Sequence, residues 1–295
     1  YSVKAEKHQR SFYKSKVSQI VGKNQKVFVI ISDALRYECA KELSKVISYE
    51  NTESRSFSVK ENHMISSLPS YTQLGMASLL PNNEVEIKST DDTVYVDGKS
   101  SKGKDARTKI LQNEDVNSIA LNDKDFLNLN RESGRELVKS NNVIYIYHNQ
   151  IDAMGDDAIT EEKVFDAVES SFNTITKIVK QIVNLNGTNI FITADHGFIY
   201  TNTPTQDSEF CKLDTTFMET SKVNRRFVIG KNLEENSCTE KFTSDELGIN
   251  GDNDFLITKS INKIRKQGGG NRFVHGGATL QELVIPLLEI KYHRK

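Results

Sequence analysis

At 295 residues, the chain is long enough for one large α/β domain or two smaller ones. Its 37% hydrophobic and 8% aromatic content excludes a disordered chain. A net charge of -1 excludes a global electrostatic footprint for nucleic acid. Three local basic runs, at 99–109, 221–226 and 262–272, are typical of solvated surfaces, yet they could equally line one anionic groove.

The cellular location of the protein can be inferred from its apolar runs, its N-terminal residues and its cysteines. No apolar run approaches the length of a membrane helix, and the first twenty residues are too charged for a secretory signal. The cysteines, Cys39, Cys211 and Cys238, are odd in number and show no ligand or redox spacing. We therefore expect a cytoplasmic protein. Because the chain starts without methionine on a helical pattern, we also expect a segment of a larger protein.

Apolar runs alternate with helical patterns along the chain. Three runs are short, apolar and β-branched, and they predict buried strands at 26–32, 142–147 and 188–193. The patterns between and around them predict helices at 4–21, 33–47, 104–113, 123–129, 131–140 and 161–184, a short helix within 66–80, and brief strands near 85–88 and 94–96. Residues 268–292 predict a glycine loop, a turn, a short helix and a last strand.

This alternation predicts a mostly parallel, three-layer α/β/α sheet. Residues 203–254 are polar and irregular, with one clear strand at 225–230, and we interpret them as a cap-like insertion. The predicted organisation is a leading helix or linker at 1–24, a core at 25–202 and 255–295, and the insertion between the two parts of the core.

Polar side chains follow the predicted strands, at the sheet edge where ligands of such folds bind. They are Asp33, His148, Asp152, Asp156, Asp195, His196 and, after a short β-like run, His275. Each alone has an ordinary explanation: Asp33 could cap a helix, and residues 195–197 could form a turn. Together, four carboxylates with histidines need a countercharge, which divalent cations usually supply. Mixed Asp/His ligation in this number indicates two sites that suit zinc or manganese.

A pair of metal ions commonly serves in-line displacement at phosphorus. A hydroxyl for that reaction is available at the predicted loop-to-helix junction in "LPSYTQLG", where Ser70, Tyr71 and Thr72 are candidates. The alternative is that Ser70 or Thr72 only caps the helix.

Five segments in order resemble the PglZ domain of BREX phage-defence systems, a branch of the alkaline phosphatase superfamily. The segments are "FVIISDALRYE", "SSLPSYTQLGMASLLP", "YIYHNQIDAMGD", "ITADHGFIY" and "RFVHGGATLQELVIPLLEI", and the resemblance spans roughly 20–291. It implies an alkaline-phosphatase-like fold with a smaller cap. It also implies that Thr72 is the nucleophile and that Asp33, Asp195 and His196 hold one metal together with it.

The second metal is implied to be held by Asp152, Asp156 and His275. Superfamily relatives usually carry His where this sequence has Asp156, which makes this site more anionic. We interpret His148 as a donor to a ligand, with direct ligation as the alternative. Arg36 is a weaker candidate for holding a phosphate, and it could instead pair with a surface carboxylate. Arg225 and Arg226 are weaker still.

The resemblance predicts a metal-dependent phosphoesterase that hydrolyses phosphomonoesters or phosphodiesters through a covalent threonine intermediate. Its cofactors would be two divalent cations, Zn or Mn. A nucleotide or DNA is among the phosphate-ester substrates that it allows, and the expected partners are other BREX proteins such as the methyltransferase, with no membrane. Two alternatives remain: a scaffold domain of a defence complex that keeps a structural metal site, and a phosphotransferase or mutase.

Overall fold

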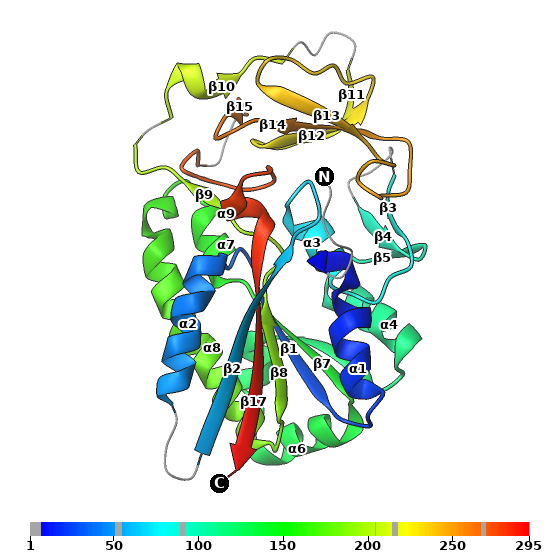
Figure 1. The fold of residues 1–295 in the computed structure, drawn as a ribbon, viewed down its shortest axis with the longest axis vertical. Helices are drawn as coiled ribbons and strands as arrows, with labels where there is room; N and C mark the ends of the chain where they lie inside the picture. The colour runs from blue at the N-terminus through cyan, green and yellow to red at the C-terminus, as the bar shows by residue number, and fades with distance from the viewer. Residues whose placement is uncertain are drawn as a thin grey trace.

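A six-stranded sheet in the order β2-β17-β8-β1-β7-β6 forms the centre of the computed structural model, which describes residues 7–50, 55–88, 93–203, 205–213, 218–266 and 270–294 (Figure 1). Its strands are β1 (Val27–Ser32), β2 (Arg55–Ile65), β6 (Ser118–Asn122), β7 (Val143–His148), β8 (Asn189–Thr193) and β17 (Val284–Arg294).

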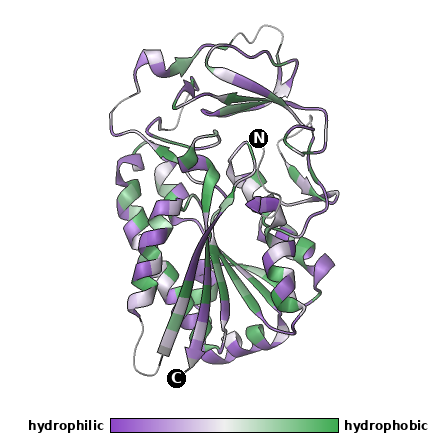
Figure 2. Ribbon diagram, viewed as in Figure 1, coloured by the Kyte–Doolittle hydropathy of each residue, from purple (hydrophilic) through white to green (hydrophobic). Residues whose placement is uncertain are grey.

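The three predicted strands lie side by side in the middle of this sheet. β1 pairs in parallel with β7 on one side and with β8 on the other, and β6 continues the parallel arrangement beyond β7. Every residue of β1, β7 and β8 is buried, as expected for strands covered on both faces. The hydropathy colouring shows the same apolar centre (Figure 2). The predicted mostly parallel sheet is therefore confirmed.

Two strands of this six-stranded sheet were missed by the sequence analysis. β2 is an edge strand of eleven residues, "RSFSVKENHMI", with few apolar positions, and β6 is the other edge. The predicted last strand exists as β17, but it does not lie at an edge. It runs antiparallel between β2 and β8, with Leu288 opposite Glu61 on one side and Ile192 on the other.

Helices cover both faces of the sheet, which gives the predicted three layers. Figure 1 shows α2 (Tyr37–Tyr49) and α8 (Val164–Asn184) on one side, with α1 (Ser18–Val21) and α4 (Lys104–Glu114) on the other. The remaining helices are α3 (Thr72–Ser78), α5 (Asp123–Leu127), α6 (Arg131–Ser140), α7 (Gln150–Gly155) and α9 (Leu280–Leu283). Within the described residues, every helix is too short or too polar to cross a lipid bilayer.

Some predicted helix bounds were wrong. The first helical segment runs over 9–21 and begins with a 3-10 turn (Gln9–Ser11) and a π turn (Tyr13–Val17), while residues 4–6 lie outside the described residues. The helix predicted from residue 33 begins only at Tyr37. The long helix is preceded by a 3-10 turn at Glu161–Lys163.

The predicted irregular insertion is more regular than expected. Four antiparallel strands form a cap sheet in the order β11 (Glu219–Val223), β12 (Phe227–Lys231), β14 (Asp254–Thr258) and β13 (Thr239–Thr243). The strand predicted at 225–230 exists as β12, and the other three strands of this sheet were missed. Beside it, β10 (Phe210–Cys211) pairs with β15 (Lys263–Ile264), and an unpredicted disulfide joins Cys211 to Cys238. Figure 1 shows the cap sheet beyond the carboxyl ends of the parallel strands.

Two smaller sheets complete the fold. β9 (Ile199–Tyr200) pairs with β16 (Phe273–Val274), so the segments that follow β8 and precede α9 are joined. The brief strands that the sequence predicted exist as β3 (Val85–Ile87) and β4 (Val94–Val96), and β5 (Lys99–Ser100) extends them.

A buried ion pair connects the cap sheet to the core. Arg226, directly before β12, donates from Nε and Nη2 to the two carboxylate oxygens of Glu282 in α9, each at 2.9 Å. Both side chains have no solvent exposure. Although burial alone would raise the pKa of Glu282, the Arg226 charge and the hydrogen bonds from Gly277 and Thr279 lower it. The pair therefore also holds the loop that carries His275.

Because this pair is buried, removing one member leaves an uncompensated charge. We expect Arg226→Met to lower the free energy of unfolding by about 3–5 kcal/mol. The double variant with Glu282→Leu should recover much of the loss, because both charges are then gone. Urea denaturation of the two variants measures this. Lys231→Met, which breaks an exposed pair with Asp252, is the control and should change stability little. Equal stability of Arg226→Met and wild type would contradict the assignment.

Candidate metal centre

The predicted site residues gather at the carboxyl ends of the parallel strands. Asp33 directly follows β1, and Asp195 and His196 follow β8. The backbone N–H of Asp33 donates to His148 O at 2.8 Å, so the ends of β1 and β7 are fixed to each other. The helix after β1 begins at Tyr37 with Arg36 as its N-cap, so Asp33 does not cap it.

Asp33, Asp195 and His196 form one buried group, with one potential ligand atom each and all three atoms within 4.8 Å of one another. His196 Nε2 lies 3.5 Å from Asp33 Oδ1 and 3.4 Å from Asp195 Oδ2. The other ring nitrogen of His196, Nδ1, lies 2.9 Å from Gly197 O. Because a carbonyl only accepts, Nδ1 carries the proton, and Nε2 faces the two carboxylates with a lone pair.

A second buried group consists of Asp152, His196 and His275. His275 Nε2 lies 3.8 Å from Asp152 Oδ1. The rings of His196 and His275 stack with their centroids 4.1 Å apart and an angle of 10° between their planes. His196 belongs to both groups, so the two groups are contiguous and form one centre.

Asp156 lies at the margin of this centre. It is the C-cap residue of α7, and its side chain is 63% exposed. Its Oδ1 is 3.8 Å from His275 Nε2, but Asp156 belongs to neither group in the described part of the chain. It ends α7, and the N-cap positions of the helical turns that follow belong to Thr160 and Lys163.

Thr72 is the first residue of α3 and brings a hydroxyl to the first group. Its Oγ1 lies 3.1 Å from His196 Nε2. The N-cap position belongs to Tyr71, so Thr72 does not cap the helix. Of the other candidates, Ser70 is buried and donates from Oγ to Gly277 O at 2.7 Å, and the buried Tyr71 ring packs against Phe227 of the cap sheet.

Close backbone approaches make this arrangement possible. A Cβ on Gly75 in α3 would collide with the backbone of Asp195, and a Cβ on Gly197 would collide with Gln281 O. Gly197 therefore serves a close approach to α9. Ala34 has φ 62°, a left-handed conformation that is uncommon for residues other than glycine, and its N–H donates to Asp195 Oδ1 at 3.2 Å.

Two residues that the sequence analysis missed support Asp195. Gln9 is fully buried and donates from Nε2 to Asp195 O at 2.7 Å, while its Oε1 accepts from the N–H of Ser67. Ser66 Oγ donates to Asp195 O at 3.1 Å. A buried glutamine in a charged N-terminal segment carries no local pattern that points to this role.

Burial and crowding shift the ionisation of these groups. Burial, and then the charges of Asp152 and Asp195, raise the pKa of Asp33 well above its ordinary value. Burial raises the pKa of Asp152, and it raises that of Asp195 to about 6. Burial and the nearby His275 lower the pKa of His196 to about 3. Each shift disfavours the charged form, because the cluster has too little compensating positive charge of its own.

The donor atoms fit divalent cations. Asp33 Oδ1, Asp195 Oδ2, Asp152 Oδ1 and His275 Nδ1 are buried, and none of them has a hydrogen-bond partner among the described residues. Unpaired buried oxygens of this kind are costly unless something binds them. Carboxylate oxygens mixed with imidazole nitrogens suit zinc or manganese. The chemistry of the donor set therefore agrees with a metal centre.

The remaining candidates have other contacts. His148 is buried at the end of β7, with Nδ1 3.0 Å from Ser32 Oγ and Nε2 3.4 Å from Gln150 Oε1. The Arg36 guanidinium pairs with Glu38, the alternative left open by the sequence, and lies 5.1 Å from the Phe198 ring centre.

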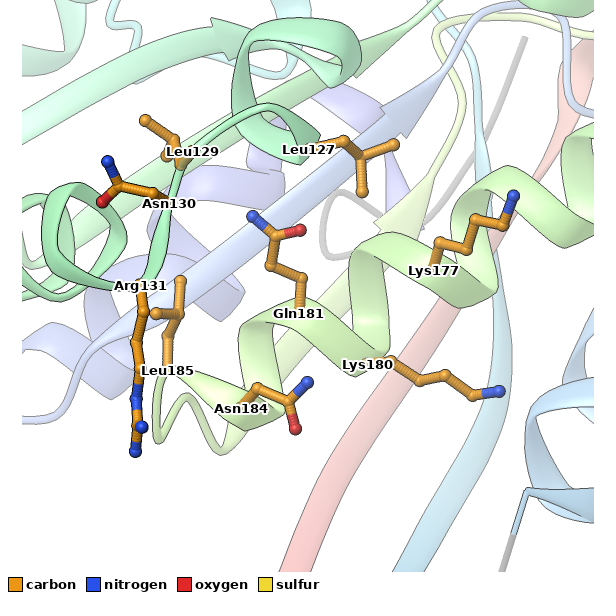
Figure 3. Close-up of a pocket in the computed structure, with 9 residues that line it drawn as sticks. All are labelled: Leu127, Leu129, Asn130, Arg131, Lys177, Lys180, Gln181, Asn184 and Leu185. Carbon is orange, nitrogen blue, oxygen red and sulfur yellow. The ribbon is translucent and has the colours of Figure 1, made fainter.

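A cavity elsewhere in the molecule lies away from this chemistry. Its volume is about 860 Å³, and it lies between α8 and the segment that joins α5 to α6 (Figure 3). The residues that line it are Leu127, Leu129, Asn130, Arg131, Lys177, Lys180, Gln181, Asn184 and Leu185. None of them follows a parallel strand at its carboxyl end, and none is a predicted site residue.

Solved structures share this fold. The murine ectonucleotide pyrophosphatase/phosphodiesterase 5, as an inactive variant in complex with AMP, superposes with a TM-score of 0.58 at 10% identity, covering 90% of this chain and 87% of that one. Phosphonoacetate hydrolase from Sinorhizobium meliloti 1021 in complex with phosphonoformate gives 0.55 at 10% identity, covering 90% and 89%. The expected fold class is therefore confirmed.

Relatives in sequence are closer. The alkaline phosphatase-like protein BrxZ of Escherichia coli O9:H4 (strain HS) is 42% identical over 274 residues, 92% of this chain and 31% of that protein. The alkaline phosphatase-like protein PglZ of Bacillus cereus (strain H3081.97) is 41% identical over 288 residues, 97% of this chain and 33% of that protein. The chain thus spans about a third of the length of these relatives.

The family match covers nearly the whole chain. Residues 12–290 match the model of the BREX system PglZ alkaline phosphatase-like domain. This range contains every predicted site residue. The resemblance seen in the five sequence segments is therefore confirmed, and the chain belongs to the PglZ family of alkaline phosphatase-like domains of BREX systems.

Proposed function

We propose that this chain is a metal-dependent phosphoesterase domain that acts in a BREX defence system. The observation that carries the proposal is the buried group of Asp33, Asp195 and His196, whose unpaired oxygens lie beside the Thr72 hydroxyl. Burying two carboxylates without a cation is costly, and a nucleophile next to a cation-binding group is the arrangement that phosphoryl transfer requires.

The proposed ligands follow the two groups. Asp33, Asp195 and His196 would hold one divalent cation with Thr72 Oγ1, and Asp152 and His275 would hold a second with Asp156 at its exposed side. Zinc or manganese suits both donor sets. Such cations, when bound, supply positive charge that stabilises phosphate oxygens and lowers the pKa of a nearby hydroxyl.

In the proposed reaction, Thr72 Oγ1 attacks phosphorus in line. The Oγ1–P bond forms as the bond from phosphorus to the leaving oxygen breaks. The Thr72 proton passes to solvent, and the substrate's alcohol group departs on the leaving oxygen, which takes up a proton from solvent. Water then hydrolyses the phosphothreonine and regenerates the hydroxyl. The unprotonated Nε2 of His196 lies 3.1 Å from Oγ1, so the hydroxyl stands beside the residues that would hold the first cation.

Substrate and partners are proposed at the level of chemical class. The structural neighbours include a protein solved with AMP and one solved with phosphonoformate, and at 10% identity they support the fold alone. We propose a phosphomonoester or phosphodiester as substrate, with a nucleotide or DNA within that class. Because the family belongs to BREX systems, we propose other BREX proteins such as the methyltransferase as partners.

Thr72→Ala tests the nucleophile. We expect the variant to lose at least about 10³-fold in hydrolysis of para-nitrophenyl phosphate esters, with folding and most bound metal retained. Thr72→Ser should keep part of the activity, and Ser70→Ala should keep most of it, because Ser70 is committed to Gly277 O. If the alanine variant turned over like wild type, Thr72 would not be the nucleophile. An inactive wild type that still bound metal would instead favour a scaffold.

Asp33→Asn tests the first cation site. The amide weakens metal binding, so elemental analysis should show less metal per chain and activity should vanish. In metal-free protein the same change removes one of several crowded carboxylates. Its melting temperature should therefore stay equal or rise, while the stabilisation by added metal should shrink. Asp207→Asn, at an exposed pair with Arg265, is the control. Equal metal content in Asp33→Asn and wild type would contradict the assignment of Asp33 as a ligand of the first cation.

Asp156 tests the second site, where superfamily relatives usually carry His. Activity would be titrated with Zn²⁺ and Mn²⁺ for wild type, Asp156→His and Asp156→Ala. Histidine should shift the preference toward Zn²⁺, because imidazole is a softer ligand than carboxylate, and alanine should be impaired. Asp166→Ala, at an exposed carboxylate in the first turn of α8, should behave like wild type. Wild-type behaviour of Asp156→Ala with both metals would remove Asp156 from the ligand set.

A further inference from the structure

The cavity shown in Figure 3 combines cations with apolar side chains. Its charged lining residues are Arg131, Lys177 and Lys180, and no carboxylate lines it in the described part of the chain. Leucines supply the apolar part of the lining, among them the half-buried Leu129 and the buried Leu185. In a chain whose net charge is -1, a cavity of about 860 Å³ with cations alone is an electrostatic exception.

The walls of this cavity are fixed by contacts between helices. Gln181 in α8 donates from Nε2 to Phe126 O at 2.7 Å, which holds the end of α5 against α8. A Cβ on Gly134 in α6 would lie 2.9 Å from the Leu185 side chain, so α6 packs closely at the end of α8 as well. The cavity is therefore formed before any ligand enters it.

Two of the three cations are not used by the ion pairs of the fold. Lys180 pairs with Glu50 at 2.7 Å. Arg131 and Lys177 are exposed, and neither has a carboxylate partner within 4 Å among the described residues. Arg131 is also the first residue of α6, where the helix dipole disfavours a positive charge. Its charge therefore does not stabilise the helix, and both cations are available to a ligand.

A second cavity, of about 820 Å³, continues the first along α6, since Arg131 lines both. It adds Arg135 and Lys139 together with Glu132 and Glu136, so its lining is mixed in charge and still positive on balance. The two cavities together are larger than the upper value of about 1,000 Å³ that is usual for small-ligand pockets. This groove, made of both cavities, therefore suits an extended segment of chain better than a single anion.

An acidic peptide fits the groove better than a nucleic acid does. Proteins bind single-stranded nucleic acid through aromatic side chains that stack on the bases, and no aromatic residue within the described residues lines either cavity. Leucines instead accept an apolar side chain, and the cations beside them complement carboxylates.

We propose that the groove is a docking site for a separate protein, which presents a short acidic segment with leucine-like anchor residues. Its carboxylates pair with Arg131 and Lys177, and its anchor residues pack on Leu129 and Leu185. This surface is independent of the proposed phosphoesterase function, because the groove shares no residue with the metal centre.

The test measures binding of three fluorescein-labelled synthetic peptides by fluorescence anisotropy. The first carries leucines flanked by glutamate and aspartate. The second has glutamine and asparagine in place of the acids, and the third has serine in place of leucine. Wild type is compared with the double variant Arg131→Glu/Lys177→Glu, with Leu129→Ser and with Lys109→Glu. Lys109 is the matched control, because it is an exposed lysine in α4, on the other face of the sheet.

We expect wild type to bind the first peptide with an affinity that falls as salt rises, and the other two at least about tenfold more weakly. The double variant and Leu129→Ser should each weaken binding of the first peptide at least about tenfold, while Lys109→Glu should match wild type. The comparison of the three peptides uses wild type alone, so it decides even where a variant unfolds. Thr72→Ala should bind like wild type, so failure of the phosphoesterase proposal leaves this test intact.

Four results would overturn the proposal. The first two are no binding of the first peptide by wild type, and equal binding of all three peptides. The third is wild-type affinity in a double variant whose melting temperature is unchanged. The fourth is assignment of the groove to another occupant: tighter binding of labelled single-stranded DNA that the double variant loses, or a dimer in sedimentation velocity that the double variant dissociates.

Discussion

The crowding of buried carboxylates at one edge of the sheet is the constraint on which the other features of the molecule depend. Asp33, Asp152 and Asp195 are placed there because β1 and β8 end there and α7 follows β7. One buried oxygen of each has no hydrogen-bond partner in the part of the chain that the structure describes, and burial disfavours the charged form of each carboxylate. A protein keeps such an arrangement at a cost in stability, and active sites are where that cost is commonly found.

The surroundings hold this edge rigid. The strained Ala34, the close approach at Gly75, and the buried Gln9 each fix the backbone around Asp33 or Asp195. The bidentate pair of Arg226 with Glu282 does the same for the loop that carries His275. These contacts come from segments far apart in sequence. They orient the donor atoms before any cation binds, which is what precise ligation requires.

The sequence predicted most of the core and most of the candidate site. Buried parallel strands are apolar throughout, and the polar residues just after them lie at one edge for topological reasons, so Asp33, Asp195 and His196 could be placed together. β2 and the cap strands β11 and β13 were missed, because half-exposed strands carry few apolar residues. The apolar β12 was predicted, whereas the equally apolar β14 was not. The exposure of Asp156 and the support from Gln9 depend on tertiary contacts that no local pattern reveals.

The basic runs illustrate the same limit. The sequence left open whether they are solvated or line a groove, and the structure gives individual members different surroundings. Arg226 is fully buried in an ion pair, and Lys263 is buried with Nζ hydrogen-bonded to Thr201 and Thr205. The Arg107 guanidinium lies over the Tyr147 ring. Charge density along a sequence therefore does not reveal which cations are committed to the fold and which are available to a ligand.

The internal position of β17 has a consequence for how the chain matures. Residues 284–294 separate β8 from β2, so β2 and one edge of β8 have no hydrogen-bonding partner in this sheet until β17 has been synthesised. Unpaired strand edges of this kind invite association with other chains. The domain should therefore depend on chaperones during synthesis, and a ribosome that stalls within the cap sheet would release an aggregation-prone product.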